Sequence, residues 1–75
     1  MITAFVLIRA RGNRVQALGE AIAELPQVGE VYSVTGPYDL IVRAEVEDMD
    51  ALGQMLSDIQ LIPGLNRTLT CIVKG

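Results

Sequence analysis

The polar side chains best suited to hold a small ligand stand together near the middle of this 75-residue chain. Glycine permits backbone dihedral angles that other residues avoid, and proline fixes φ, so Gly36 and Pro37 predict a tight turn. Tyr38 and Asp39 follow directly. They place a phenol and a carboxylate, which can both form hydrogen bonds, where the chain leaves the turn. The segment therefore predicts a binding site for a small polar ligand.

Catalytic and metal chemistry find little support in the rest of the sequence. The chain has no histidine, which is the commonest general acid–base residue, and a haem protein would lack a histidine ligand. Cys71 is the single cysteine, so neither a disulfide nor a metal-binding thiol pair can form, and its apolar neighbours predict a buried side chain. The acidic residues at 45–50 are more typical of a helix start than of a metal site. We expect no catalytic residues, no metal and no cofactor.

Charge and composition limit the partners of the chain. The net charge is −3 and Arg9 and Arg11 form the densest basic pair, whereas a nucleic-acid partner requires a basic face. No apolar stretch reaches the roughly 18 residues that span a bilayer, and no basic segment precedes the apolar start as in a signal peptide. We therefore expect no direct nucleic-acid or membrane partner. The single cysteine fits a reduced, cytoplasmic setting.

The pattern of apolar residues predicts six elements in the order β-α-β-β-α-β. Strands are expected at 2–9, 28–34, 40–46 and 65–74. One helix is expected between Asn13, as its N-cap, and Pro26. A second is expected to start at Asp48 or Asp50 and to end before Pro63. This order predicts an α+β, ferredoxin-like fold of one domain spanning 1–75: a four-stranded antiparallel sheet with two helices on one face.

The sheet face away from the helices is expected to be partly apolar, although in a monomer it would be polar. Alternation assigns to it the side chains of Phe5, Leu7, Val34, Ile41 and Ile72. Hydrophobic residues also make up 51% of this short chain, more than one small core needs. Because an exposed apolar patch usually marks an interface, we expect a homodimer with the sheets face to face, a dimeric α+β barrel. The alternative is a strand register shifted by one residue, which would exchange the two faces.

Three segments carry a resemblance to a known family: AFVLI at 4–8, VxxVTGxYDL at 31–40 and PGLxRTxTxIV at 63–73. The chain resembles, over essentially its whole length, the effector-binding (RAM) domain of the Lrp/AsnC family of amino-acid-responsive regulators. Members usually carry an N-terminal helix-turn-helix domain that binds DNA. Here the first strand follows Met1 at once, so we expect a stand-alone form of the domain.

The resemblance implies an amino-acid effector bound between dimers, and regulation of transcription or metabolism through assembly. It also implies a larger homo-oligomer, such as an octameric ring, and a full-length DNA-binding relative as a partner. Backbone N–H groups of Gly36, Tyr38 and Asp39 suit a carboxylate, and the Asp39 carboxylate suits an ammonium group. The Tyr38 ring could pack over the ligand, and hydroxyls of Thr68 and Thr70 could add contacts.

Each of these roles has a plainer alternative. Asp39 could simply accept N–H groups of the turn, and Tyr38 could fill an interface. Thr68 and Thr70 are also ordinary strand residues by propensity. Arg43 could pair with Glu45 or Glu30 across the sheet, or reach a partner chain. For the whole chain, the alternative is a small cofactor-independent enzyme of the dimeric barrel type, with a polar cavity inside the barrel.

Overall fold

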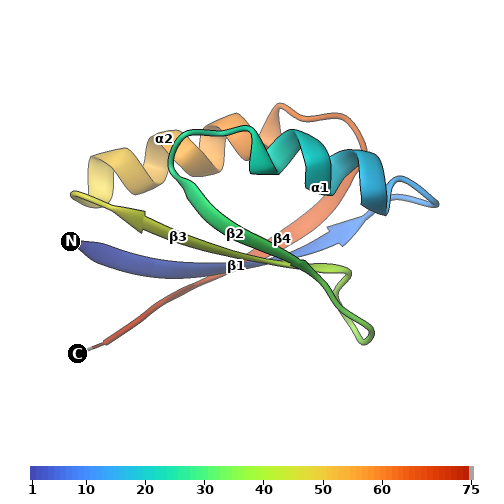
Figure 1. Ribbon diagram of the computed structural model, residues 1–75, viewed down its shortest axis with the longest axis horizontal. Helices are drawn as coiled ribbons and strands as arrows, with labels where there is room; N and C mark the ends of the chain where they lie inside the picture. Colours follow the sequence, from blue (N-terminus) through green and yellow to red (C-terminus); the bar gives the residue numbers. More distant parts are fainter. Residues whose placement is uncertain (75) are drawn as a thin grey trace.

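A computed structural model describes residues 1–74 and confirms the predicted order of elements (Figure 1). The strands are β1 (Ile2–Ala10), β2 (Val28–Ser33), β3 (Leu40–Val46) and β4 (Leu65–Ile72). The helices are α1 (Val15–Ala23) and α2 (Met49–Gln60). The strands form one antiparallel sheet in the order β2-β3-β1-β4, so the first and third strands are central. The ferredoxin-like α+β prediction is therefore correct.

The core lies between the two helices and one face of the sheet, and Figure 1 shows both helices on that side. Every second residue of the central strands is buried there, because successive strand residues point to opposite faces. The core consists mainly of Ala4, Val6, Ile8, Leu18, Ile22, Leu40, Val42, Ala44, Leu52, Met55 and Ile59. Neither helix in residues 1–74 is both long and apolar enough to cross a membrane.

The two helices begin in different ways. Asp48 caps α2, since its side-chain oxygen Oδ1 accepts a hydrogen bond from Ala51 N at 2.8 Å. The predicted cap of α1, Asn13, is wrong: Arg14 occupies the N-cap position and makes no side-chain cap bond. A turn closed by Arg14 N and Arg11 O, 3.3 Å apart, precedes the helix and leaves Asn13 one residue too early to cap it.

Strand β4 faces the opposite way from the prediction. Thr70 and Ile72 lie across from Val6 and Ala4, so both are on the helix-covered side, and the assignment of Ile72 to the other face is wrong. The alternation of β4 could not decide between its faces, because apolar residues occupy both. It is also an edge strand, and Ile72 remains exposed on that side.

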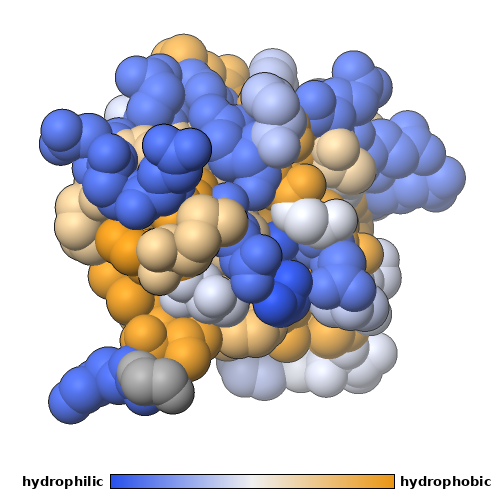
Figure 2. Space-filling model, turned by 60° about the vertical axis from the view of Figure 1, so that its left-hand side comes forward, coloured by the Kyte–Doolittle hydropathy of each residue, from blue (hydrophilic) through white to orange (hydrophobic). Residues whose placement is uncertain are grey.

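The sheet face without helices, here called the open face, carries a continuous apolar surface. Its members are Phe5, Leu7, Tyr32, Ile41, Leu69 and Cys71. Four of them form a row across all four strands, and Tyr32 and Leu69 at its ends are 48% and 49% exposed. Cys71, which was expected to be buried, is exposed here. In Figure 2, orange and white side chains gather along the lower border, below the hydrophilic residues that cover much of the upper part.

Candidate ligand site at the Gly36 turn

The Gly36 turn connects β2 to β3 and projects from one end of the sheet (Figure 1). A hydrogen bond from Val34 N to Asp39 O at 3.0 Å closes the turn. Gly36 has a φ of +152°, and a Cβ built on it would meet no atom within 4 Å. Glycine is therefore required here for its backbone angle rather than for space. A bond from Asp39 N to Ile8 O at 2.8 Å fixes the end of the turn to β1. The prediction that the Asp39 N–H binds a ligand carboxylate is therefore wrong, because β1 already accepts it.

The Asp39 carboxylate supports the fold directly. Its Oδ2 accepts a hydrogen bond from Ala10 N at 2.8 Å. Strand β3 begins at Leu40, opposite Ile8, so no β3 residue pairs with Ala10, and the aspartate side chain supplies the acceptor instead. This resembles the plainer role expected for Asp39, except that the donor belongs to β1 and not to the turn. Within residues 1–74 no hydrogen bond reaches the other carboxylate oxygen, Oδ1, which leaves it available to a ligand.

Two arginines from neighbouring strands contact the turn. Arg9 donates a hydrogen bond from Nη1 to Pro37 O at 2.7 Å. The guanidinium carbon of Arg67 lies 5.9 Å from the centre of the Tyr38 ring, a distance typical of a cation–π interaction. Arg9 and Arg67 face each other across β1 and β4. The sequence interpretation missed both, although Arg67 lies two residues from Leu69 and thus on the same face of β4.

Thr68 and Thr70 do not join this group. They lie opposite Ile8 and Val6, on the side of β4 that faces the helices. Thr68 Oγ1 accepts a hydrogen bond from Gln60 Nε2 of α2 at 3.3 Å. The structure therefore brings together Gly36, Tyr38 and Asp39 and keeps the two threonines on the other face of the sheet.

A small hollow lies between the turn and the open face, with a volume of about 190 Å³. The turn lines one side of it. Leu7 of β1, Ile41 of β3 and Val34, which follows β2, line the other. Tyr38 also borders it. Pockets that enclose a small molecule usually measure about 300–1,000 Å³. The hollow is thus large enough for one side chain, and it lies beside the open face.

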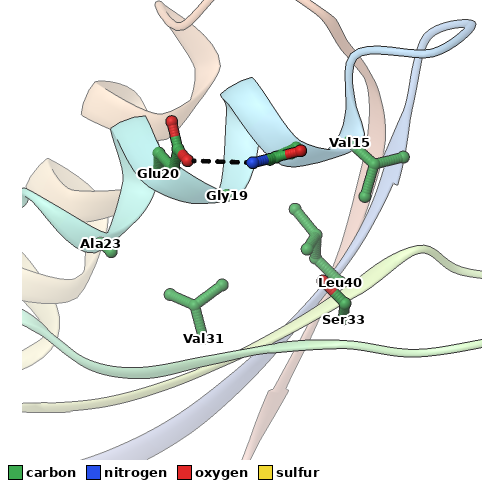
Figure 3. A pocket seen from close by; sticks show the side chains of 8 residues that line it. Val15, Gly19, Glu20, Ala23, Val31, Ser33 and Leu40 are labelled. Carbon is green, nitrogen blue, oxygen red and sulfur yellow. Dashed lines mark hydrogen bonds between the residues drawn. The ribbon is translucent and has the colours of Figure 1, made fainter.

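A larger groove of about 470 Å³ runs between α1 and β2 (Figure 3). Figure 3 shows Val31 and Leu40 rising from the sheet below the helix, with Gly19 above them. Its polar rim includes Gln16 and Glu20, which are 3.4 Å apart in a hydrogen bond along the helix. One carboxylate beside apolar walls offers no pair of groups for acid–base chemistry.

A charged cluster borders the open face on β2 and β3. Arg43 pairs with Glu45 at 3.0 Å and with Glu30 at 3.7 Å, as predicted. Tyr32 donates its hydroxyl to Glu30 at 2.7 Å. This hydrogen bond, more than desolvation or the negative charge of Glu30, raises the pKa of Tyr32 above its ordinary value of 10.0, and the nearby Arg43 opposes the rise. Ion pairs and a hydrogen bond at the protein surface therefore hold the cluster together.

Sequence comparison relates the chain to regulators. The model of the Lrp/AsnC ligand binding domain matches residues 3–74. The HTH-type transcriptional regulator FL11 of Pyrococcus horikoshii is 33% identical over 70 residues, covering 93% of this chain and 46% of that protein. The chain spans about half the length of such regulators. A homocitrate synthase of Sulfurisphaera tokodaii is 30% identical over 73 residues, covering 96% of this chain but 16% of the enzyme.

Solved structures agree with this relationship. TTHA0845 from Thermus thermophilus is 59% identical, with a TM-score of 0.95, and the match covers 100% of this chain and 95% of that one. The regulator NMB0573 of Neisseria meningitidis, solved as a complex with L-Met, has a TM-score of 0.86. That match covers 99% of this chain and 50% of the regulator, and at 21% identity it shows a common fold alone. By its sequence and its fold, the chain belongs to the Lrp/AsnC ligand-binding domain family.

Proposed function

We propose that the chain forms a single domain that acts as a regulatory module and binds an amino acid at the Gly36 turn. The observation that carries this proposal is the set of groups at the Gly36 turn, which lines a small apolar hollow. The turn carries backbone N–H groups and one unused carboxylate oxygen, and a guanidinium group lies over its Tyr38 ring. An α-amino acid has the complementary set of groups, which are a carboxylate, an ammonium group and a side chain. The homologous transcriptional regulators support a regulatory role.

Each part of the ligand would meet a group of matching charge. The carboxylate would bind Arg67 and the N–H groups of Gly36 and Tyr38, which form no backbone hydrogen bond within residues 1–74. Charge-assisted hydrogen bonds of this kind are the strongest available. The ammonium group would bind Oδ1 of Asp39, whose Oδ2 is occupied by Ala10 N. The ligand side chain would enter the hollow beside Leu7 and Ile41.

A second chain would complete the site. The hollow is too small to enclose a ligand and lies at the open face, which we propose as the surface of a homodimer. Further association of dimers, into an octamer or with a DNA-binding relative, would then respond to the ligand. Occupation of a site shared between chains would stabilise the assembly, because binding shifts the equilibrium toward the form that binds.

A binding module accounts for these groups better than a small enzyme does. An enzyme of the dimeric barrel type would need acid–base groups converging on a cavity between the two sheets. The side chains that line the hollow are mostly apolar, and the chain has no histidine. The similarity to homocitrate synthase covers 16% of that enzyme, so it gives no support for the same activity here.

The proposal can be tested by thermal unfolding in the presence of each of the twenty amino acids, L-Met included. A ligand at 100 times its Kd stabilises the folded state by about 2.7 kcal/mol, so at least one amino acid should raise Tm by several degrees. Arg67→Gln should reduce this shift, whereas Lys74→Gln, with the same change of charge, should retain it. The absence of a shift with every amino acid would contradict the proposal.

A further inference from the structure

The positive charge of this acidic domain is concentrated at one end. Four of its six basic residues lie where β1 ends and β4 begins: Arg9, Arg11, Arg14 and Arg67. Of the acidic side chains nearby, Asp39 accepts a hydrogen bond from Ala10 N, and Asp58 in the last turn of α2 accepts one from Gln54 at 3.0 Å. The end that carries the Gly36 turn is therefore basic, although the chain has a net charge of −3.

Two of these arginines line a pocket on the helix side of this end. The pocket has a volume of about 510 Å³ and lies between the turn at 11–14 and the loop at 60–66. The residues with polar side chains that line it are Arg11, Arg14, Gln60 and Asn66. No carboxylate is among the described residues that line it. The pocket thus offers hydrogen-bond donors of positive charge with no internal counter-charge.

The walls of the pocket are fastened to each other. Arg11 N donates a hydrogen bond to Gly64 O at 2.7 Å. Gly64 has a φ of +97°, and a Cβ built on it would lie 3.1 Å from Cβ and from Cδ of Arg14. The aliphatic part of Arg14 therefore rests on the Gly64 backbone, which restricts where its guanidinium group can lie. A guanidinium group held in this way loses less conformational entropy on binding than a free one.

Neither guanidinium group forms an ion pair or a side-chain hydrogen bond within residues 1–74. Two positive charges at one pocket repel each other, and an anion between them would relieve the repulsion. The planar fork of donors on arginine matches the two oxygens of a carboxylate or phosphate. We propose that this pocket is a binding site for a small oxyanion, held by Arg11 and Arg14 with help from the side-chain amides.

This site is separate from the proposed amino-acid site. The amino-acid site lies on the open face, beside Tyr38 and Arg67, whereas the oxyanion pocket lies between the turn before α1 and the segment that joins α2 to β4. Either site can therefore exist without the other. A substitution in one site leaves the residues that line the other site unchanged.

NMR titration of the whole chain tests the oxyanion site. Inorganic phosphate and succinate are added in separate arms, with sodium chloride adjusted to keep the ionic strength constant. Saturable shifts of the Arg11, Gly64 and Leu65 amides in either arm are the expected result, and the tighter arm shows whether the site prefers a phosphate or a dicarboxylate. Arg11→Gln should weaken binding at least about tenfold, the loss expected for one charge-assisted hydrogen bond. That variant retains the backbone bond to Gly64, so it should fold.

Arg67→Gln is the matched control, since it removes the same charge from the same end but lies outside the pocket. It should bind both anions with unchanged affinity and yet lose the thermal shift with amino acids. Arg14→Gln provides a second variant within the pocket. Shifts that rise without saturation in both arms would overturn the proposal. Equal affinities in the wild type and in both pocket variants would overturn it as well.

Discussion

Asp39 illustrates how one side chain can serve stability and binding at once. One of its oxygens accepts the Ala10 N–H, and the other is available to a ligand. An Asp39→Ala variant would leave that partly buried N–H without an acceptor, which costs about 1–3 kcal/mol. Asp39→Asn retains an acceptor oxygen and removes the charge.

We therefore expect Asp39→Ala to lower the free energy of unfolding by about 1–3 kcal/mol, and Asp39→Asn to lower it by less than half as much. Urea denaturation followed by circular dichroism measures both. Asp39→Asn should nevertheless bind an amino-acid ligand much more weakly than the wild type does, because the ammonium group of the ligand loses its negatively charged partner. Equal stability of the alanine variant and the wild type would show that the Ala10 contact contributes nothing.

The residues at the turn also show what a sequence can predict about a site. Gly36, Tyr38 and Asp39 are consecutive or nearly so, and their chemistry identifies the turn without a structure. Arg67 contacts Tyr38 only because β4 pairs with β1 in one register. A one-residue change of register would have placed Thr68 there instead, which is the arrangement that the sequence interpretation favoured.

Helix α2 contains a glycine that lowers the stability of the helix. Gly53 lies in the middle of the helix, exposed, and a Cβ built on it would meet no atom within 4 Å. Glycine in a helix interior costs about 0.8–1.0 kcal/mol relative to alanine. We expect Gly53→Ala to stabilise the domain by about that amount and to raise Tm by about 4–8 °C.

Gly36→Ala is the matched control for this prediction, because it makes the same chemical change at a φ of +152°. There the added Cβ has space but strains the backbone, so we expect a loss of about 1–3 kcal/mol. Differential scanning calorimetry measures both variants. A drop in Tm for Gly53→Ala would count against the prediction and would indicate that the outer face of α2 packs against another chain.

At the level of elements, the sequence predicts the fold almost completely. The buried positions of α2 recur at helical spacing, and Asp48 marks its start. The start of α1 could not be placed in the same way, because it depends on a turn held by backbone bonds alone. The faces of β4 were equally undetermined, since Leu69 and Ile72 have similar hydrophobicity and only pairing with β1 distinguishes them.

For the whole molecule, the open face is the feature that most needs a partner. An apolar row crosses all four strands, and no helix or strand within residues 1–74 covers it. We expect the chain to sediment as a dimer or larger at micromolar concentration. Leu7→Glu would place a charge in the middle of that row, and a buried, unpaired charge is strongly unfavourable.

Leu7→Glu should therefore sediment as a monomer under conditions in which the wild type does not. Leu61→Glu is the control, because Leu61 is 81% exposed in the loop after α2 and lies outside the open face. Both variants should retain the circular dichroism spectrum of the wild type. A wild-type chain that sediments as a monomer would refute the dimer, and a dimeric Leu7→Glu variant would place the interface on another surface.

The strand order β2-β3-β1-β4 has a consequence for biosynthesis. Strand β1 leaves the ribosome first, yet its two neighbours are made later, and β4 is completed only at Ile72. Until then β1 remains an apolar edge with unpaired backbone groups, which is the kind of edge that invites pairing with other nascent chains. Of the two central strands, β1 is therefore the one that waits longer for its neighbours. Prompt pairing with β4 would protect the newly made chain from aggregation.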